Sequence, residues 1–179
     1  MTVWSTGREE RNPIKRGGAL RVTCDEFAVW ARAMIEGRNA LAFVSGQDNT
    51  WRECRVFFRN ATTGLEVVWD YGIDVRFGPL VYGALPPAPA HDGRGVSYPS
   101  HYLSALVALR APGRTVGAYE LSDSPEVGRA NLEVALREVA DALFEVAADV
   151  LDGDFSVFHT LDEAAWSRGE VWRDSQPQS

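Results

Sequence analysis

A long amphipathic helix constrains the fold of this chain more than any other feature of its sequence. Ser124 suits an N-cap, and Pro125 suits the first helical position, where a missing N–H costs nothing. Apolar residues then recur at alternating spacings of four and three as far as Gly153; they are Leu132, Leu136, Val139, Leu143, Val146 and Val150. The pattern predicts one helix over residues 125–151, roughly 40 Å long and able to cross a whole sheet.

A shorter helix is predicted over residues 24–36. Thr23 and Glu26 have the spacing of a capping box, in which each side chain satisfies a backbone N–H of the other residue. An apolar stripe at helical spacings follows and ends before Gly37; it consists of Phe27, Trp30, Ala31, Met34 and Ile35.

Short segments with the character of strands lie between these two helices. Residues 40–44, 55–59, 65–69 and 73–77 are apolar or alternate between apolar and polar, and residues 60–64 suit a hairpin connection. Because the segments leave no room for crossover helices, they favour an antiparallel meander.

The remaining elements rest on weaker patterns. Proline followed by glycine at 112–113 predicts a type II turn. We therefore interpret residues 102–110 and 115–121 as a second hairpin, with a short helix over 102–110 as the alternative. Residues 155–158 are predicted to form a last strand and residues 161–167 a last helix.

These elements together predict an α+β fold in a single domain over residues 1–179. A meander-like antiparallel sheet packs against the long C-terminal helix and the shorter N-terminal helix. Residues 1–22 and 173–179 are expected to be flexible termini.

The charge of −7 is unevenly distributed along the chain. Residues 120–174 hold 14 acids and 4 arginines, whereas residues 1–119 hold 11 acids and 14 basic residues. An acidic protein is a poor match for nucleic acid but attracts a partner with a basic surface. No segment is apolar enough for a membrane span. Lys15 is the only lysine, and this arginine bias favours a bacterial source.

Cysteine usage and the N-terminal composition indicate a cytoplasmic protein. Cys24 and Cys54 lack the spacing of a zinc site, and we expect two reduced, buried thiols, although a disulfide between them remains possible. The polar, basic N-terminal residues lack the apolar stretch of a secretion signal. No phosphate loop, dinucleotide fingerprint or metalloprotease motif is present, so no cofactor and no metal are predicted.

The long helix carries the candidate binding surface. Glu138, Asp141, Glu145 and Asp149 follow at spacings of three and four and so share one face, where Arg137 is the nearest cation but is better placed to pair with Glu133. Aromatic and acidic residues that suit an interface accompany them; they are Trp69, Asp70, Tyr71, Asp74 and Trp166.

This combination favours a non-catalytic protein-binding module. In size and composition the chain resembles the small, acidic, tryptophan-containing α+β proteins that neutralise bacterial toxins by binding them. The resemblance implies an inhibitor or immunity-type protein that covers a basic partner with its acidic helix. The oligomeric state is left open.

Two alternatives remain at this point. A small-molecule enzyme or ligand-binding domain would use residues 83–99 as a lid and His91, Asp92 and His101 as its polar groups, with a cysteine or Ser97 as nucleophile. A structural or assembly subunit is the other alternative, and it predicts higher oligomers of the purified chain.

Overall fold

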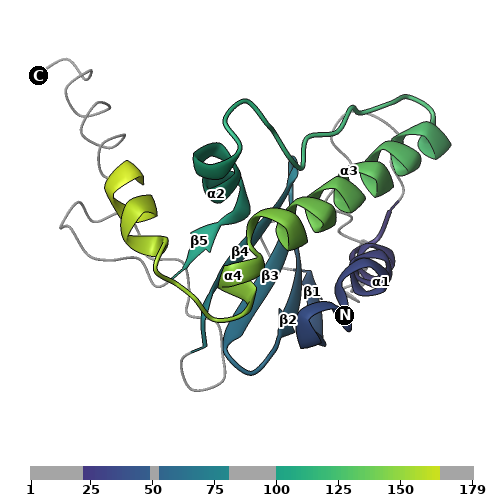
Figure 1. Cartoon of the computed structure of the whole chain (residues 1–179). Coiled ribbons are helices and arrows are strands. Elements are labelled where there is room, and N and C mark those ends of the chain that lie inside the picture. Colours follow the sequence, from purple (N-terminus) through teal and green to yellow (C-terminus); the bar gives the residue numbers. More distant parts are fainter. Residues whose placement is uncertain (1–21, 49–52, 81–99, 166–179) are drawn as a thin grey trace, which may run out of the picture.

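The computed structural model describes residues 22–48, 53–80 and 100–165 (Figure 1). The predicted flexible termini, apart from Val22, lie outside the described residues, and so does the predicted lid over residues 83–99. Within the described ranges, no helix is long and apolar enough to cross a membrane.

The sheet is a five-stranded antiparallel meander, as the sequence predicts. Its strands are β1 (Ala42–Asp48), β2 (Cys54–Arg59), β3 (Thr63–Trp69), β4 (Ile73–Pro79) and β5 (His101–Tyr102), and their order in the sheet is their order in the chain. Each strand pairs antiparallel with the next, and residues 60–62 connect β2 to β3 as a hairpin.

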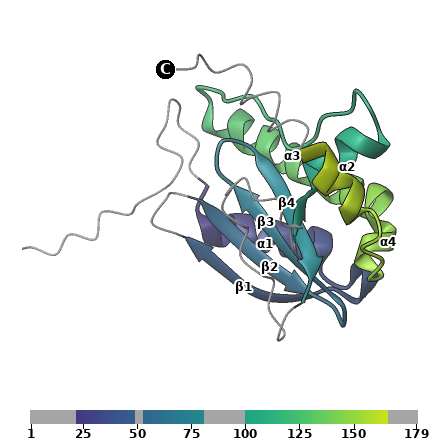
Figure 2. The same ribbon diagram turned by 90° about the vertical axis from the view of Figure 1, so that its left-hand side faces the viewer.

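Two helices cover one face of this sheet. Helix α1 (Cys24–Ile35) contacts β1 and β2, while the long helix α3 (Pro125–Val146) contacts β4 and α1. Both helices lie behind the strands in Figure 2, and α3 crosses them in Figure 1. The α+β fold class predicted from the sequence is therefore confirmed.

The core lies between the sheet and these helices. Alternate strand residues such as Val67 and Val75 are fully buried, because successive side chains of a strand point to opposite faces. The predicted apolar stripe of α3 meets them, and Leu132 through Leu143 at that spacing have no exposed surface. Trp69 stacks on Phe27 with ring centroids 4.6 Å apart, which joins β3 to α1.

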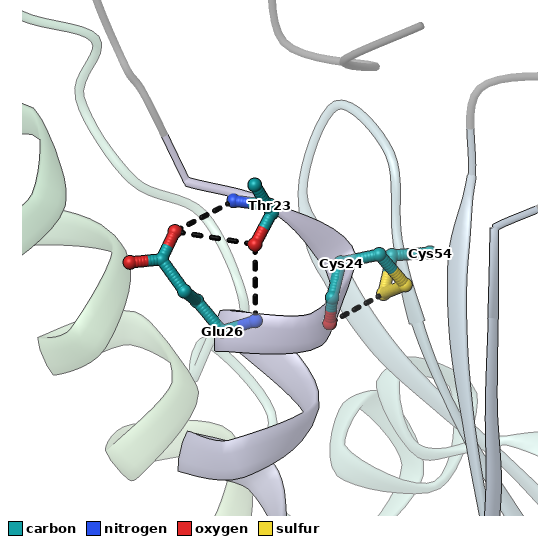
Figure 3. Close-up of a disulfide and its surroundings, with 4 residues drawn as sticks. All are labelled: Thr23, Cys24, Glu26 and Cys54. Carbon is teal, nitrogen blue, oxygen red and sulfur yellow. Dashed lines mark hydrogen bonds between the residues drawn. A yellow bond between two sulfur atoms is a disulfide. The ribbon is translucent and has the colours of Figure 1, made fainter. Parts of the chain in front are cut away.

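Both predicted helix starts are confirmed. At α1, Thr23 and Glu26 form the reciprocal capping box drawn in Figure 3. At α3, the Ser124 side chain accepts from the N–H of Val127, and Pro125 takes the first position.

The long helix is not continuous, which corrects the predicted span of 125–151. It breaks at Ala147 and resumes as the short helix α4 (Ala148–Leu151), and Gly153 then turns with φ +94°. At the break, the carbonyl of Val146 accepts a hydrogen bond from Arg110 Nη1 at 2.6 Å. The carbonyl at the end of α3 therefore has a hydrogen-bond donor from a side chain that is distant in the sequence.

The second predicted hairpin is wrong, and its helical alternative is right. Residues Leu103–Arg110 form helix α2, and residues 115–121 form no strand. Ser104 at the start of α2 donates both its N–H and its hydroxyl to the carboxylate of Asp74, a helix cap that lies far away in the sequence. The turn itself is confirmed, because Gly113 has φ +88° and the N–H of Arg114 donates to Ala111.

The predicted strand over 155–158 is also wrong. The N–H of Phe158 donates to the carbonyl of Phe155, so the chain turns there and enters a helix at Phe158. This helix covers residues 158–165 of the described chain, and the rest of the predicted helix over 161–167 lies outside it. A short helix, η1 (Arg38–Ala40), completes the structure.

The two cysteines form a disulfide, and the prediction of reduced thiols is wrong. Cys24 is the first residue of α1 and Cys54 the first residue of β2, and their Cα atoms lie 5.3 Å apart (Figure 3). This separation is within the range that a disulfide bridges. The sequence did not reveal this pairing, because the two cysteines are 30 positions apart and meet only when α1 packs onto β2.

A buried ion-pair cluster lies on the opposite face of the sheet. Glu66 and Arg76 face each other across β3 and β4, and Arg76 Nε donates to Glu66 Oε2 at 2.6 Å. Arg55 donates to the other oxygen of Glu66 at 3.1 Å and also binds Glu53. The Glu66 side chain is only 1% exposed, so removal of its charge weakens two charge-assisted hydrogen bonds in a buried site.

We expect Glu66→Gln to lower the free energy of unfolding by about 2–3 kcal/mol, because a buried charged hydrogen bond is lost and an arginine stays in place. Glu53→Gln is the matched control, since Glu53 binds the same Arg55 at a site that is 24% exposed, and its cost should stay below about 1 kcal/mol. Urea unfolding followed by circular dichroism measures both. Equal effects of the two substitutions would contradict the buried cluster.

Candidate functional site

Arginines distant in the sequence pair with two of the predicted acids, Glu145 on α3 and Asp149 on α4. Arg114 Nη1 lies 2.8 Å from Glu145, and Arg110 binds Asp149 through both of its terminal nitrogens, at 2.7 and 2.6 Å. The Arg110 guanidinium holds the pKa of the Asp149 carboxyl below its usual range. Two of the four acids predicted to form the binding surface are therefore paired with arginine within the fold.

Arg38 reaches the acidic face of α3, 3.7 Å from Asp141. The pairs made by Arg38, Arg110 and Arg114 could not be predicted, because each arginine is distant from its acid in the sequence. The predicted pairing of Arg137 with Glu133 is present at 3.1 Å. Glu138 differs from the other acids of this face, because among the described residues it has no hydrogen-bond or ion-pair partner.

The segment that follows α2 runs alongside the N-terminal half of α3 (Figure 1). It is fixed to the sheet where the N–H of Ile73 donates to the carbonyl of Gly117 at 2.8 Å. It is fixed to the helix where Asn131 Nδ2 donates to the carbonyl of Glu120 at 3.0 Å. These two bonds hold residues 118–120 at a set position beside α3.

A shallow, open hollow of about 220 Å³ lies between this segment and the helix. Residues 118–120 form one wall, and Asn131, Val134, Ala135 and Glu138 form the other. Two carboxylates, Glu120 and Glu138, therefore flank a lining that also contains an aromatic ring, a valine and alanines. Glu120, like Glu138, has no ion-pair partner among the described residues.

Trp69 lies beneath this hollow rather than on the surface. It is 1% exposed, and its Nε1–H donates to the hydroxyl of Tyr119 at 3.0 Å. Burial raises the pKa of Tyr119, and the bond from Trp69 partly offsets that shift. Trp69 thus positions a lining residue of the hollow and makes no contact surface itself.

Three exposed aliphatic side chains lie in the hollow's lining or near it in the chain: Val134 is a lining residue, Leu121 follows the lining residue Glu120, and Val127 lies one helical turn before the lining residue Asn131. Leu121 and Val134 are each 55% exposed, and Val127 is 49% exposed. Val127, Asn131, Val134 and Glu138 follow at spacings of four, three and four, so they share one face of α3. We call the exposed residues Glu120, Leu121, Val127, Val134 and Glu138 the α3 patch.

The other predicted binding residues lie apart from this hollow's lining. Tyr71 is 71% exposed, and Asp70 beside it is also exposed. Asp74 accepts hydrogen bonds from Val75 and Ser104, and its burial raises its pKa. Trp166 lies outside the described residues. Of the predicted set, Glu138 lines the hollow and Trp69 bonds to the lining residue Tyr119, whose pKa the carboxylate of Asp70 also helps to raise.

The polar groups of the enzyme alternative are only partly described. His91 and Asp92 lie outside the described residues. His101 is buried, and its Nε2 lies 3.0 Å from Oδ1 of Asp162. Burial lowers the pKa of His101, and the Asp162 carboxylate partly offsets that shift. No group of three or more potential metal ligands occurs within residues 22–48, 53–80 and 100–165.

The lowered pKa of His101 predicts acid sensitivity. Since the unfolded chain binds this proton at a pH of about 6.5, the histidine's contribution to stability is complete above that pH and is lost as the pH falls through the folded pKa. We expect the free energy of unfolding to fall as the pH drops below about 6.5, and His101→Gln to flatten that dependence. Equal pH dependences of wild type and His101→Gln would contradict this assignment.

Sequence reasoning missed most of the α3 patch. The signal was present, because Val127 and Val134 interrupt the polar side of a helix whose apolar stripe lies elsewhere. Tyr119 and Glu120, on the opposite wall of the hollow, could not be placed beside α3 from the sequence, since residues 115–121 were predicted as a strand. No family model, curated protein or solved structure matches this chain.

Proposed function

We propose that this protein is a non-catalytic protein-binding module that holds a partner with a basic surface on the outer face of α3. One observation carries the proposal: exposed Val134 lines the same hollow as two carboxylates, Glu120 and Glu138, that have no partner among the described residues. Exposed Leu121 follows Glu120 in the chain, and exposed Val127 lies earlier on α3. Aliphatic side chains at the centre and charges at the rim are typical of protein–protein interfaces.

The acids already held by arginine extend this surface. Asp141 and Glu145 continue the face of α3 beyond Glu138, and Asp149 follows on α4. The Arg38–Asp141 and Arg114–Glu145 ion pairs are single contacts near the surface and therefore weak, so a cation of the partner competes with these two arginines at little cost. We assign binding of the partner to the α3 patch, and steering of its approach to the wider acidic face.

A module of this kind suits an inhibitor of the immunity type, in which covering a bacterial toxin's basic surface is the whole activity. The disulfide bears on the compartment, because disulfides persist in oxidising compartments and are rare in cytosolic proteins. A cytoplasmic site of action, which we infer from the sequence, therefore requires that Cys24 and Cys54 are reduced there.

Capture of the partner from a lysate of the source organism tests the proposal. We expect one discrete basic protein, retained at low salt and released at high salt, because exposed charges are screened. A variant with glutamine at Glu138, Asp141, Glu145 and Asp149 should lose this protein.

The matched control removes four negative charges from exposed positions elsewhere. It places the corresponding amides at Asp25, Glu36, Asp123 and Glu163, and it should capture as the wild type does. Capture that survives the helix substitutions, or that falls equally in both variants, would overturn the proposal.

A further inference from the structure

The hollow beside α3 has a size that distinguishes among possible occupants. At about 220 Å³ and open to solvent, it is smaller than the roughly 300–1,000 Å³ of pockets that enclose a free small molecule. A single long side chain of a partner protein can enter an open hollow from the solvent side, because the rest of the partner stays outside it. The dimensions therefore favour part of a macromolecule.

The lining selects the chemistry of that side chain. Val134, Ala135 and the Tyr119 ring offer apolar surface, while Glu120 and Glu138 offer carboxylate oxygens. Lysine and arginine side chains combine an apolar stem with a cationic head, so they can pack the stem and keep the head among acceptors.

A third acceptor favours arginine over lysine. The Nδ2 of Asn131 is used in the bond to Glu120, so among the described residues its Oδ1 is left as a free acceptor in the same wall. A planar guanidinium has five N–H donors and stacks on aromatic rings, whereas a lysine head is a compact charge with three donors. The hollow offers acceptors on both walls and the Tyr119 ring beside them, and this arrangement suits the planar guanidinium of arginine better than the ammonium group of lysine.

We propose that this hollow receives one arginine side chain of the partner protein, with its guanidinium between Glu120 and Glu138 and its stem against Val134 and Tyr119. The inference rests on the proposed binding function and names the chemistry of its anchor. The exposed Leu121 and Val127 would then contact aliphatic neighbours of that arginine.

The probe is a short capped peptide in which arginine is flanked by leucines, compared with peptides carrying lysine or the uncharged isostere citrulline in its place. Titration into the ¹⁵N-labelled full chain is followed by backbone amide shifts. We expect saturable shifts in residues 117–121 and 131–138 with the arginine peptide, and weaker binding of both other peptides.

Glu138→Gln should weaken binding of the arginine peptide about tenfold, since a charge-assisted hydrogen bond is removed. Glu145→Gln is the matched control, because this acid lies on the same helix but is not among the residues that line the hollow, and it should change the affinity less than about twofold. Both positions are exposed, so neither variant is expected to unfold, and the amide spectrum checks this directly.

Equal binding of the lysine or citrulline peptide, equal weakening by both substitutions, or no saturable shift at millimolar peptide would overturn the inference. Such a failure is separable from that of the proposed function. If the quadruple helix variant loses the basic partner but the peptide does not bind, only the arginine anchor is wrong. If capture survives in that variant, the binding function itself is wrong.

Discussion

Gly117→Ala is expected to lower the free energy of unfolding by about 4 kcal/mol. Gly117 has φ +79°, and a Cβ atom built there would lie 1.7 Å from the carbonyl oxygen of Ile73. The left-handed conformation costs an alanine about 1–2 kcal/mol, and relief of the clash requires the backbone to separate. That separation breaks the hydrogen bond between Ile73 and Gly117 and releases the wall of the hollow.

Gly113→Ala is the control for conformation alone. Gly113 has φ +88°, yet nothing lies within 4 Å of the Cβ position. The Gly113→Ala substitution should lower the free energy of unfolding by about 1 kcal/mol, because the alanine must adopt the left-handed conformation but meets no clash. Urea unfolding of both variants gives the comparison. Similar losses at the two glycines would show that the close approach of residue 117 to β4 is not present.

Reduction of the disulfide is expected to cost about 3.5 kcal/mol of stability. Cys24 and Cys54 are 30 positions apart, and cross-linking a loop of that length lowers the entropy of the unfolded chain by about this amount. Urea unfolding with and without a reductant measures the difference. The Cys24→Ala/Cys54→Ala variant should be less stable than the oxidised wild type by a similar amount and should not respond to the reductant.

A thiol assay on the unfolded, unreduced protein checks the premise of that prediction. We expect no reactive thiol before reduction and two afterwards, which is the full cysteine content of the chain. Two reactive thiols before reduction, or a wild type whose stability is unchanged by the reductant, would contradict the disulfide.

The elements with local signals were predictable from the sequence. The capping box at Thr23, the Ser124-Pro125 start and the alternating strand residues each act within a few positions of the chain. They were enough to give the meander and both principal helices. The α2 helix was less predictable, because the side chain that caps it belongs to Asp74 on β4.

The charges show the limit of sequence reasoning most directly. The spacing of the acids predicts that they share one helix face, but Asp149 belongs to α4, beyond the break at Ala147. Their partners Arg110 and Arg114 lie 39 and 31 positions away from Asp149 and Glu145, so only the folded chain reveals the neutralisation. The disulfide and the hollow likewise depend on which distant segments meet, which no local pattern specifies.

A photo-crosslinking amino acid at Val134, introduced in cells of the source organism, tests most directly whether the α3 patch is a binding surface. Val29 on α1 is the comparison position, because it is also aliphatic and is 65% exposed against 55% for Val134. We predict a discrete crosslink to a basic protein from position 134 and none from position 29. No crosslink from position 134, or the same products from both positions, would contradict a partner at this face.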